Sequence, residues 1–342
     1  MKAGIESSQL SIEVLNVPIA DGGDGTLDAV ETATASTSHS VDVIGAIGQP
    51  VKARWLAVGD QALVELACAS GLAMLSLNQL DPLGAHTVGT GQVLLNCLEA
   101  GYHDVIVCVG GSASTDGGAG LLTALGAKFL DKAGHAVPLG GGSLRKVSRC
   151  DLSALEKWNH TRIRVATDVT SPLLGRYGAA SIFGAQKGAT LAQVSILDQA
   201  LKQFADVLES ATGQYVRDVA GAGAAGGTGF GVACALNAEI VSGFQWLAAI
   251  VDLENKISQS DLVITAEGRL DHQSLVGKAT GELVKLCQKY HKPLWVVPAV
   301  SEENIDWHQH GIELVVNASV SGEPATFASV QELVHELVST ID

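Results

Sequence analysis

The fold class follows from three consecutive segments: "SDLVITAEG" (residues 260–268), "GKATGELVKLCQKYH" (277–291) and "KPLWVVPAVS" (292–301). The first and third are short apolar runs typical of buried strands, and the second has the spacing of an amphipathic helix. A fourth segment, "GIELVVNAS" (311–319), repeats the strand pattern. Strands that alternate with helices of about 10–15 residues predict a parallel, doubly wound α/β sheet.

The middle of the chain begins with a different pattern, in which predicted strands follow one another without helices between them. The segments "SVDVIGAI" (40–47), "VKARWLAV" (51–58) and "ALVELAC" (62–68) are separated by turn residues only. Parallel strands need long crossover connections, so short turns predict antiparallel pairing here. Helix, strand and glycine-loop patterns follow, among them a long amphipathic helix over 189–213 with a stop at Gly213.

The first 38 residues resemble the α/β pattern at the other end of the chain. "SIEVLNVPIA" (11–20) predicts a strand, "DGGDGT" (21–26) a loop and the next eight residues a helix. Because 342 residues exceed the size of most single cores, we expect two domains. The predicted division is a discontinuous Rossmann-like domain over 1–38 and 250–342, with an inserted mixed α/β domain over 39–249.

Composition excludes several classes of protein. The formal net charge is −15 and no Lys/Arg run is present, which argues against a nucleic-acid-binding face. No apolar run reaches the length of about 18 residues expected of a membrane span, and residues 1–11 have no signal-peptide core. The six cysteines form no C-x-x-C pair, so we expect a reducing, cytoplasmic setting.

Glycine is the most informative residue type, with 39 copies gathered next to apolar runs. Four loops that follow predicted strands carry carboxylates, and all but the third also contain glycine: "ADGGDG" (20–25), "GGSASTDGG" (110–118), "TDVTSP" (167–172) and "AEGRLD" (266–271). Open α/β sheets bind ligands beyond the carboxyl ends of their strands, where glycine lets backbone N–H groups approach phosphate.

The same loops suit phosphoryl transfer. Carboxylates near a phosphate site are suitable ligands for Mg²⁺, and Lys187 and Lys278 lie close to such loops in the sequence. The alternative for any single loop is that its Asp forms a turn or caps a helix, and that each Lys is a surface residue. "GAGAAG" (221–226) also matches a dinucleotide-binding pattern, which leaves a nucleotide-cofactor oxidoreductase open.

Taken together, the ordered motifs resemble those of the bacterial glycerate kinase (type 1) family. The matching segments span residues 12–319 and are "PIADGGDGT" (18–26), "GGSASTDGGAG" (110–120), "LGAKF" (125–129), "GGGSL" (140–144), "ATDVTSPLLG" (166–175), "FGAQKGA" (183–189), "GAGAAGGTG" (221–229) and "AEGRLDHQSLVGK" (266–278). An ordered series of this kind is far more specific than any one glycine loop.

The resemblance implies a kinase that transfers a phosphoryl group from ATP to a hydroxyl of D-glycerate with Mg²⁺, the 2-position being favoured. It implies two α/β domains with the active site in the cleft between them, and leaves the oligomeric state open. By motif, the candidate catalytic residues are Asp21, Asp168, Glu267, Asp271 and Lys278, and the candidate Mg²⁺ ligands are Asp168 and Glu267. Predicted contacts to substrate or phosphate are Gly22, Gly23, Gly110, Gly111, Ser112, Asp116, Lys187, Gly223, Gly226, Gly227, Gly268, Arg269 and Ser274.

One departure from the family pattern concerns the first residues. Family members usually open with a strand and a loop resembling Asp-Ser-Phe-Lys-Gly-Ser, whereas this sequence starts near the end of the helix that follows. A missing parallel strand would expose the apolar face of its neighbour. The expectation is therefore either an active kinase or an inactive, ligand-binding or regulatory relative.

Overall fold

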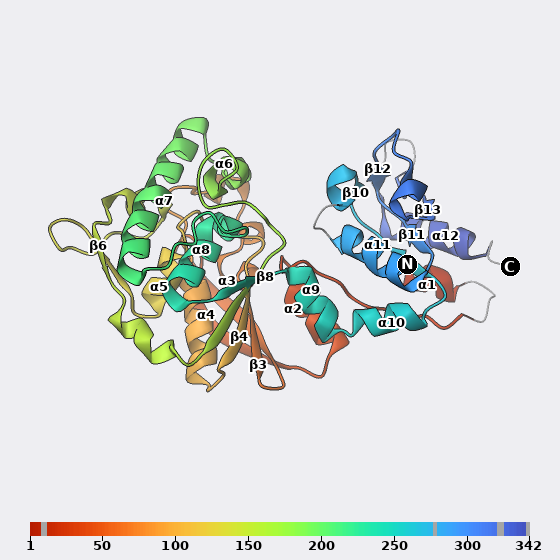
Figure 1. Cartoon of the computed structure of the whole chain (residues 1–342), viewed down its shortest axis with the longest axis horizontal. Helices are drawn as coiled ribbons and strands as arrows, with labels where there is room; N and C mark the ends of the chain where they lie inside the picture. Colours follow the sequence, from red (N-terminus) through yellow and green to blue (C-terminus); the bar gives the residue numbers. More distant parts are fainter. Residues whose placement is uncertain (8–11, 276–278, 320–324, 340–342) are drawn as a thin grey trace. The chain divides into compact units, whose positions relative to one another are not determined.

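The computed structural model describes residues 1–7, 12–275, 279–319 and 325–339. The chain forms two compact units, which are described separately (Figure 1). The larger unit comprises Ala20–Leu247. The smaller unit combines Met1–Ile19 with Ala248–Asp342 and is therefore discontinuous in sequence.

The larger unit is a mixed α/β unit. Its strands are β1 (Thr37–Ile44), β2 (Pro50–Val58), β3 (Gln61–Glu65), β4 (Asp104–Cys108), β5 (Lys128–Leu130), β6 (Arg149–Asp151), β7 (Arg162–Ala166) and β8 (Glu239–Val241). Its α-helices are α2 (Thr26–Ala33), α3 (Ala67–Ser70), α4 (Val88–Glu99), α5 (Ala119–Ala124), α6 (Ala179–Phe183), α7 (Leu191–Thr212), α8 (Ala224–Leu236) and α9 (Gly243–Ile250), the last of which continues into the smaller unit. Short 3₁₀ turns include Ala185–Lys187.

Six of these strands form one sheet in the order β1-β2-β3-β4-β7-β8. The pairs β1–β2 and β2–β3 are antiparallel, as predicted from the short turns between them. The pairs β3–β4, β4–β7 and β7–β8 are parallel. The α/β fold class is confirmed, and four parallel strands end on the same edge of the sheet.

Both faces of this sheet are buried. Val64 and Val107 lie in the main apolar core together with Val93 and Leu94 of α4. Successive side chains of a strand alternate between faces, so the fully buried Leu63 points the opposite way. Helix α2, which contacts β2 and β3, carries the fully buried Leu27 and Val30.

Helix α7 confirms the predicted amphipathic helix. It runs over Leu191–Thr212 and buries a stripe that includes Leu197, Leu201 and Phe204. Thr190 caps its first turn, and Gly213 ends it with a left-handed φ of 71°.

The smaller unit contains the predicted parallel sheet. Strands β9 (Val263–Thr265), β11 (Leu294–Val296) and β13 (Leu314–Val315) pair in the order β13-β11-β9, and both pairs are parallel. A second parallel pair joins β10 (Arg269–Leu270) and β12 (Val300–Ser301). The helices are α1 (Lys2–Glu6), α10 (Leu253–Gln259), α11 (Ala279–Tyr290) and α12 (Phe327–Val338), with 3₁₀ turns at His272–Leu275 and Trp307–His310. Helix α1 packs on α12.

Two expectations for the first 38 residues differ from the structure. The predicted strand over 11–20 is wrong for the described residues 12–20, where Ile12 and Leu15 are about half exposed and no ladder forms. An apolar run without a neighbouring strand to pair with does not form a strand. Residues 20–38, assigned by sequence to the discontinuous domain, belong to the larger unit because α2 packs on β2 and β3.

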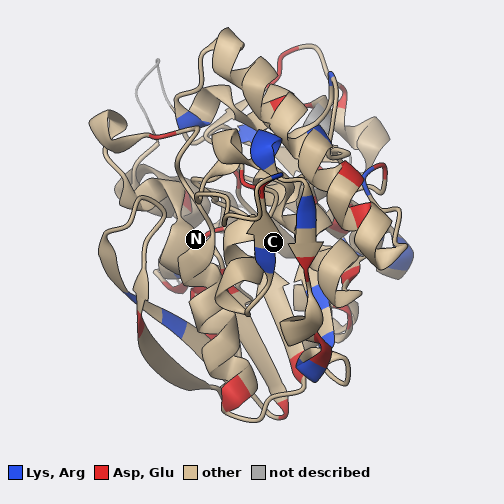
Figure 2. Cartoon of the chain, turned by 90° about the vertical axis from the view of Figure 1, so that its left-hand side faces the viewer, with Lys and Arg blue, Asp and Glu red and all other residues tan. Residues whose placement is uncertain are grey.

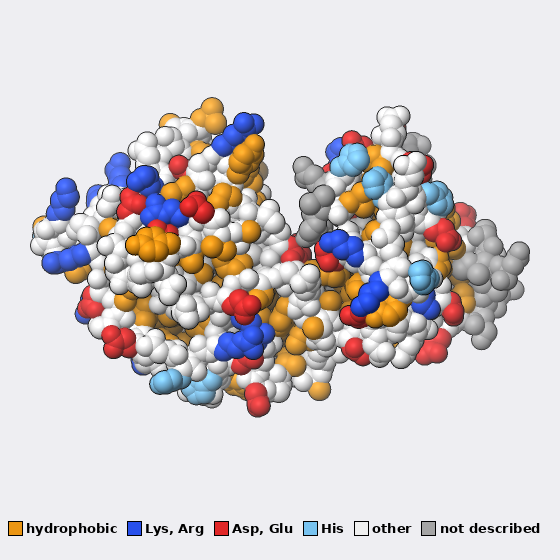
Figure 3. All heavy atoms as spheres, viewed as in Figure 1, with side chains coloured by type: hydrophobic (Ala, Val, Ile, Leu, Met, Phe, Trp, Pro, Cys, Tyr) orange, Lys and Arg blue, Asp and Glu red, His pale blue; other side chains and the backbone are white. Residues whose placement is uncertain are grey.

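Charge is distributed rather than concentrated. Lys and Arg of the larger unit occur on several elements in Figure 2, interspersed with Asp and Glu. The face shown in Figure 3 likewise mixes apolar, acidic and basic side chains. Among the described residues, no helix has the length and apolar character needed to cross a bilayer.

The start of α8 gives a stability prediction. Gly226 has a φ of 65°, and a Cβ atom there would overlap Ser114 O and lie 2.5 Å from Thr115 Cα. We expect Gly226→Ala to lower the free energy of unfolding by about 2–4 kcal/mol, from left-handed strain plus overpacking. Gly213→Ala is the matched control, because Gly213 has a similar φ but no neighbour within 4 Å of the added atom. Urea unfolding of both variants measures the difference in free energy of unfolding. Equal losses of stability in the two variants would contradict close packing of Gly226 against Ser114 and Thr115.

Candidate active site

The candidate active site is built on the edge where the four parallel strands end. Glu65, Cys108, Ala166 and Val241 are aligned across β3, β4, β7 and β8 by the strand register. The residues that follow these strand ends include the predicted Gly110 and Asp168. This is the edge of an open α/β sheet at which ligands bind.

The loop after residue 20 lies directly on this edge. Gly110 N donates a hydrogen bond to Gly22 O (3.0 Å), and a Cβ atom on Gly110 would overlap Gly23 Cα. A Cβ atom on Gly22 would lie 2.7 Å from Ala166 O. The glycines are therefore required for close backbone approach, and they bring Asp21 to the ends of β4 and β7.

Asp168 is half-buried, and both of its carboxylate oxygens accept hydrogen bonds. Ser242 Oγ donates to Oδ1 (2.7 Å) and Phe244 N, in the first turn of α9, donates to Oδ2 (3.0 Å). Burial raises the pKa of Asp168, and the charge of Asp21 raises it further. A Cβ atom on Gly243 would overlap Asp21 O, so the start of α9 lies against the backbone of Asp21 as well as bonding to Asp168.

The loop after β4 turns inward beyond Gly111. Ser112 Oγ and Ser114 Oγ lie 3.1 Å apart, and the ammonium of Lys187 donates to Ser114 O. Lys187 is only 2% exposed, and burial lowers the pKa of its ammonium to about 8 despite the nearby charge of Asp116. In this conformation Lys187 contacts the protein backbone rather than solvent.

Asp116 is fully buried, and its carboxylate accepts four hydrogen bonds. Its Oδ2 accepts from Thr87 N (2.9 Å), Thr87 Oγ1 (2.9 Å) and Gly120 N (3.1 Å), and its Oδ1 accepts from Gly118 N (3.2 Å). The carboxylate thereby ties the start of α4 to the start of α5. This geometry corresponds to the capping alternative for that loop.

The glycine turn over 221–227 packs against the same loops. Gly117 N donates to Gly226 O (3.0 Å), and a Cβ atom on Gly223 would overlap Pro172 O. Gly227 has a φ of 89°, and a Cβ atom there would lie 2.7 Å from Leu173 Cδ1. The glycines of this turn therefore serve the close packing of the start of α8 against neighbouring loops.

A second group of predicted residues lies in the smaller unit. Ser274 is fully buried, and its Oγ donates to Glu267 Oε2 (2.9 Å). Glu267 Oε1 is buried and has no hydrogen-bond partner within the part of the chain that the structure describes. Arg269 is exposed, and its Nε lies 3.6 Å from Asp271 Oδ2. Gly268 is exposed, and Lys278 lies outside the described residues.

The structure thus brings some predicted residues together and leaves others apart. Asp21, Gly22, Gly23, Gly110 and Asp168 are neighbours in the larger unit. Glu267, Arg269 and Ser274 are neighbours in the smaller unit. A metal site shared by Asp168 and Glu267 stays a prediction, and over the described ranges no group of three or more His, Cys, Asp or Glu side chains is arranged to hold a metal ion.

Sequence reasoning missed Glu65 and Ser242. Glu65 is 2% exposed and accepts hydrogen bonds from Gly25 N (3.1 Å) and Leu27 N (2.8 Å) at the start of α2. A charged residue inside the apolar run "ALVELAC" is unusual, because Glu is almost never fully buried without partners. That signal was present in the sequence. Ser242 carried no comparable signal.

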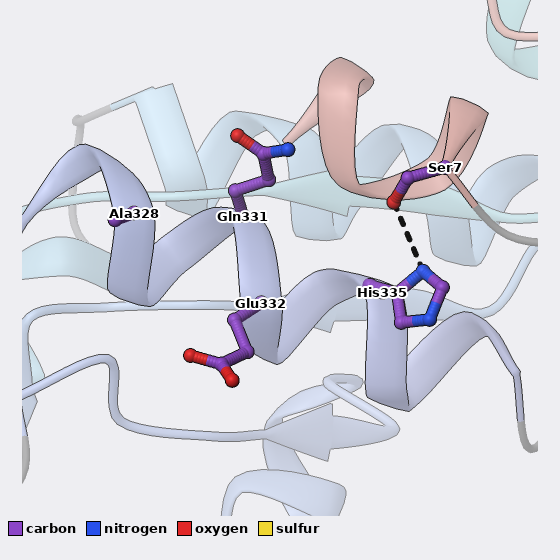
Figure 4. Close-up of a pocket in the computed structure, with 5 residues that line it drawn as sticks. All are labelled: Ser7, Ala328, Gln331, Glu332 and His335. Carbon is purple, nitrogen blue, oxygen red and sulfur yellow. Dashed lines mark hydrogen bonds between the residues drawn. The ribbon is translucent and has the colours of Figure 1, made fainter.

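A shallow depression in the smaller unit is a separate feature. It has a volume of about 370 Å³ and lies at α1 and α12, lined by Ser7, Ala328, Gln331, Glu332 and His335 (Figure 4). Ser7 Oγ and His335 Nδ1 are 2.9 Å apart across it. None of the predicted site residues lines this depression.

Comparison with known proteins agrees with the fold. Residues 1–341 match the model of the glycerate kinase family. The chain is 42% identical to glycerate 2-kinase of Escherichia coli K12 over 90% of this chain and 82% of that protein, and 38% identical to glycerate kinase of Bacillus subtilis 168 over 92% and 83%. A crystal structure of a Salmonella typhimurium LT2 protein assigned as glycerate kinase 2 has a TM-score of 0.83 and 34% identity, covering 99% of this chain and 91% of that one.

These findings define the class of protein as a phosphotransferase enzyme. The chain belongs to the glycerate kinase family. The resemblance seen in the motifs is thereby confirmed.

The two neighbouring carboxylates give a titration prediction. Since the negative charge of Asp21 raises the pKa of Asp168, Asp21→Asn should lower that pKa. Asp24→Asn is the control, because Asp24 belongs to the same loop but acts on Glu65. Carbon-13 NMR titration of the Asp168 carboxyl in the metal-free and nucleotide-free protein measures both effects. An unchanged Asp168 pKa in Asp21→Asn would show that the two groups do not interact.

Lys187 gives a second pH prediction. Its pKa is lowered from 10.5 to about 8 in the folded protein, so between these values the unfolded chain binds more protons and this residue makes stability rise with pH. Lys187→Met should remove that contribution, and its free energy of unfolding should rise less with pH than that of the wild type. Urea unfolding at pH 7.5, 9 and 10.5, with Lys202→Met as an exposed control, provides the measurement. Parallel wild-type and Lys187→Met curves would refute a lowered Lys187 pKa.

Proposed function

We propose that the protein transfers the γ-phosphoryl group of ATP to a hydroxyl of D-glycerate, and that 2-phosphoglycerate is the product. Family membership supports a kinase, and the relative from Escherichia coli K12 is named glycerate 2-kinase. In this reaction the substrate hydroxyl oxygen bonds to the γ-phosphorus as the bond to the bridging oxygen breaks. ADP leaves, and the hydroxyl proton must be accepted by a base.

The observation that carries the proposal is the Asp21–Asp168 pair. A carboxylate with a raised pKa is a better proton acceptor than an ordinary Asp, and burial together with Asp21 provides this for Asp168. Ser242 Oγ and Phe244 N hold both oxygens of Asp168, which fixes their direction. We therefore assign the role of proton acceptor to Asp168, and propose both Asp168 and Asp21 as metal ligands.

Mg²⁺ fits the same residues. The charge of Asp21 raises the pKa of Asp168, so the two carboxylates repel each other, and Mg²⁺ prefers oxygen ligands of this kind. When bound, the ion would offset charge on the triphosphate. Glu267, with a buried Oε1 that lacks a partner among the described residues, is a further proposed oxygen ligand in the smaller unit.

Substrate anions need cationic or N–H donors, and each unit offers a candidate donor. In the smaller unit, the exposed guanidinium of Arg269 offers a forked donor suited to a carboxylate or a phosphate. In the larger unit, the Gly110–Ser112 turn is proposed to contact the nucleotide through its backbone.

The proposal is tested by assaying the purified chain with MgATP and D-glycerate. Phosphorus-31 NMR distinguishes 2-phosphoglycerate from 3-phosphoglycerate. We expect Asp168→Asn to lower kcat by about 10²–10⁴-fold, the range for loss of an acid–base group. Asp198→Asn is the control, because Asp198 also accepts a backbone N–H, from Gly175 (2.9 Å), and is not among the candidate site residues.

Other outcomes would reject the proposal. Tight binding of ATP or D-glycerate without ADP formation would identify a ligand-binding relative rather than an enzyme. Formation of 3-phosphoglycerate alone would retain the kinase and reject the 2-position. Equal activity of Asp168→Asn and wild type would exclude Asp168 from the chemistry.

A further inference from the structure

Glu65 is a buried carboxylate that caps a helix belonging to another part of the sequence. It ends β3 and is 2% exposed. Its Oε1 accepts from Gly25 N (3.1 Å) and its Oε2 accepts from Leu27 N (2.8 Å), both at the start of α2. The N-cap residue of α2 is Gly25, which has no side chain to satisfy these amides. Glu65 therefore supplies the cap that α2 lacks.

The start of α2 is connected to Asp21 by a short series of hydrogen bonds. Thr26 Oγ1 donates to Gly23 O (2.7 Å), and Gly23 N donates to Asp21 Oδ1 (3.0 Å). Gly110 N donates to Gly22 O from the other side of the loop. A displacement of the first turn of α2 would therefore move Asp21 relative to Asp168.

We propose that Glu65 is a positioning residue for phosphoryl transfer: by holding the first turn of α2, it fixes the loop that places Asp21 beside Asp168. Glu65 does not itself contact the substrate. This inference rests on the proposed function, which assigns Asp21 and Asp168 to the reaction.

The surroundings of Glu65 are consistent with a structural anion. Burial raises its pKa, the neighbouring Asp24 raises it further, and the two amide hydrogen bonds oppose both effects. Cys68 Sγ lies 3.6 Å from Glu65 Oε1 as a weak additional donor. The amides of Gly25 and Leu27 thus favour the ionised form and oppose the rise in pKa that burial causes.

The chain offers a control in Glu209, a second buried carboxylate whose Oε2 also accepts from Arg217 Nε (2.8 Å). This residue is also 2% exposed, and its Oε1 accepts from Val216 N (3.2 Å) and Arg217 N (3.1 Å). The segment it holds carries none of the candidate site residues. A general loss of stability should therefore affect Glu209 and Glu65 variants alike, whereas a loss of positioning should affect Glu65 variants alone.

The experiment compares Glu65→Gln with Glu209→Gln in the full chain. Gln keeps the size of Glu but replaces one acceptor oxygen by a donor that faces an amide N–H. We expect Glu65→Gln to lower kcat by about 10–100-fold, the scale of a small misplacement of a reacting group. KM for ATP and D-glycerate should change by less than about threefold. The misplaced group acts in the transition state, so its loss lowers kcat and kcat/KM equally and leaves KM nearly unchanged. Amide hydrogen exchange should accelerate at Gly25 and Leu27.

Glu209→Gln should lower the melting temperature by at least as much, because it also removes the ion pair with Arg217. Its kcat should stay within about twofold of wild type, because its site is separate from the reacting groups. Should Glu65→Gln fail to fold, Glu65→Asp retains the charge but is too short to reach both amides, and the same kcat loss is expected. Normal kcat in a folded Glu65 variant, or equal kcat losses in both Gln variants, would overturn the positioning role alone. Absence of phosphoryl transfer in the wild type would instead overturn the proposed function and this inference with it.

Discussion

The structure of the larger unit depends on hydrogen bonds from backbone N–H groups to buried or half-buried carboxylates at one edge of the sheet. Glu65 holds the start of α2, Asp168 accepts from the first turn of α9, and Asp116 accepts from Gly118 and Gly120 around the start of α5. The positive end of a helix dipole favours negative charge, so the amides at these helix starts offset part of the cost of burying carboxylates. These helix starts are consequently already satisfied by the protein, and substrate phosphates must be met by a metal ion, by cationic side chains or by other loop amides.

Several glycines serve backbone packing, whereas their abundance beside strand ends first suggests contact with phosphate. At Gly22, Gly110 and Gly243 the missing side chain allows one backbone segment to lie against another. The resulting contacts fix Asp21 and Asp168 next to each other. Much of the glycine content is therefore used to assemble the edge of the sheet, and the approach of a ligand to the same loops is a separate use.

Much of the fold could be predicted from the sequence, because its signals are local. The antiparallel strands before residue 68 followed from short turns, and α7 followed from its periodicity and Gly213. The strand expected over 11–20 did not form in residues 12–20, since strand formation requires a partner that local sequence does not reveal. Asp21 and Asp168 are candidate residues that the loop motifs alone single out. Ser242 and the amide donors of α2 and α9 cannot be found in this way, because their contacts join residues far apart in the chain. Whether a given Asp contacts a ligand or caps a helix, as Asp116 does, also depends on such distant partners.

The packing of α1 on α12 has a consequence for the order of folding during synthesis. The larger unit is one continuous segment, so its residues are all available once Leu247 has left the ribosome. Helix α1 precedes the larger unit in the sequence, whereas its packing partner α12 follows it. Contacts between such distant segments form slowly, and domains tend to fold as they emerge. The smaller unit can therefore be completed only after the larger unit has been synthesised, and α1 lacks its packing partner during that interval.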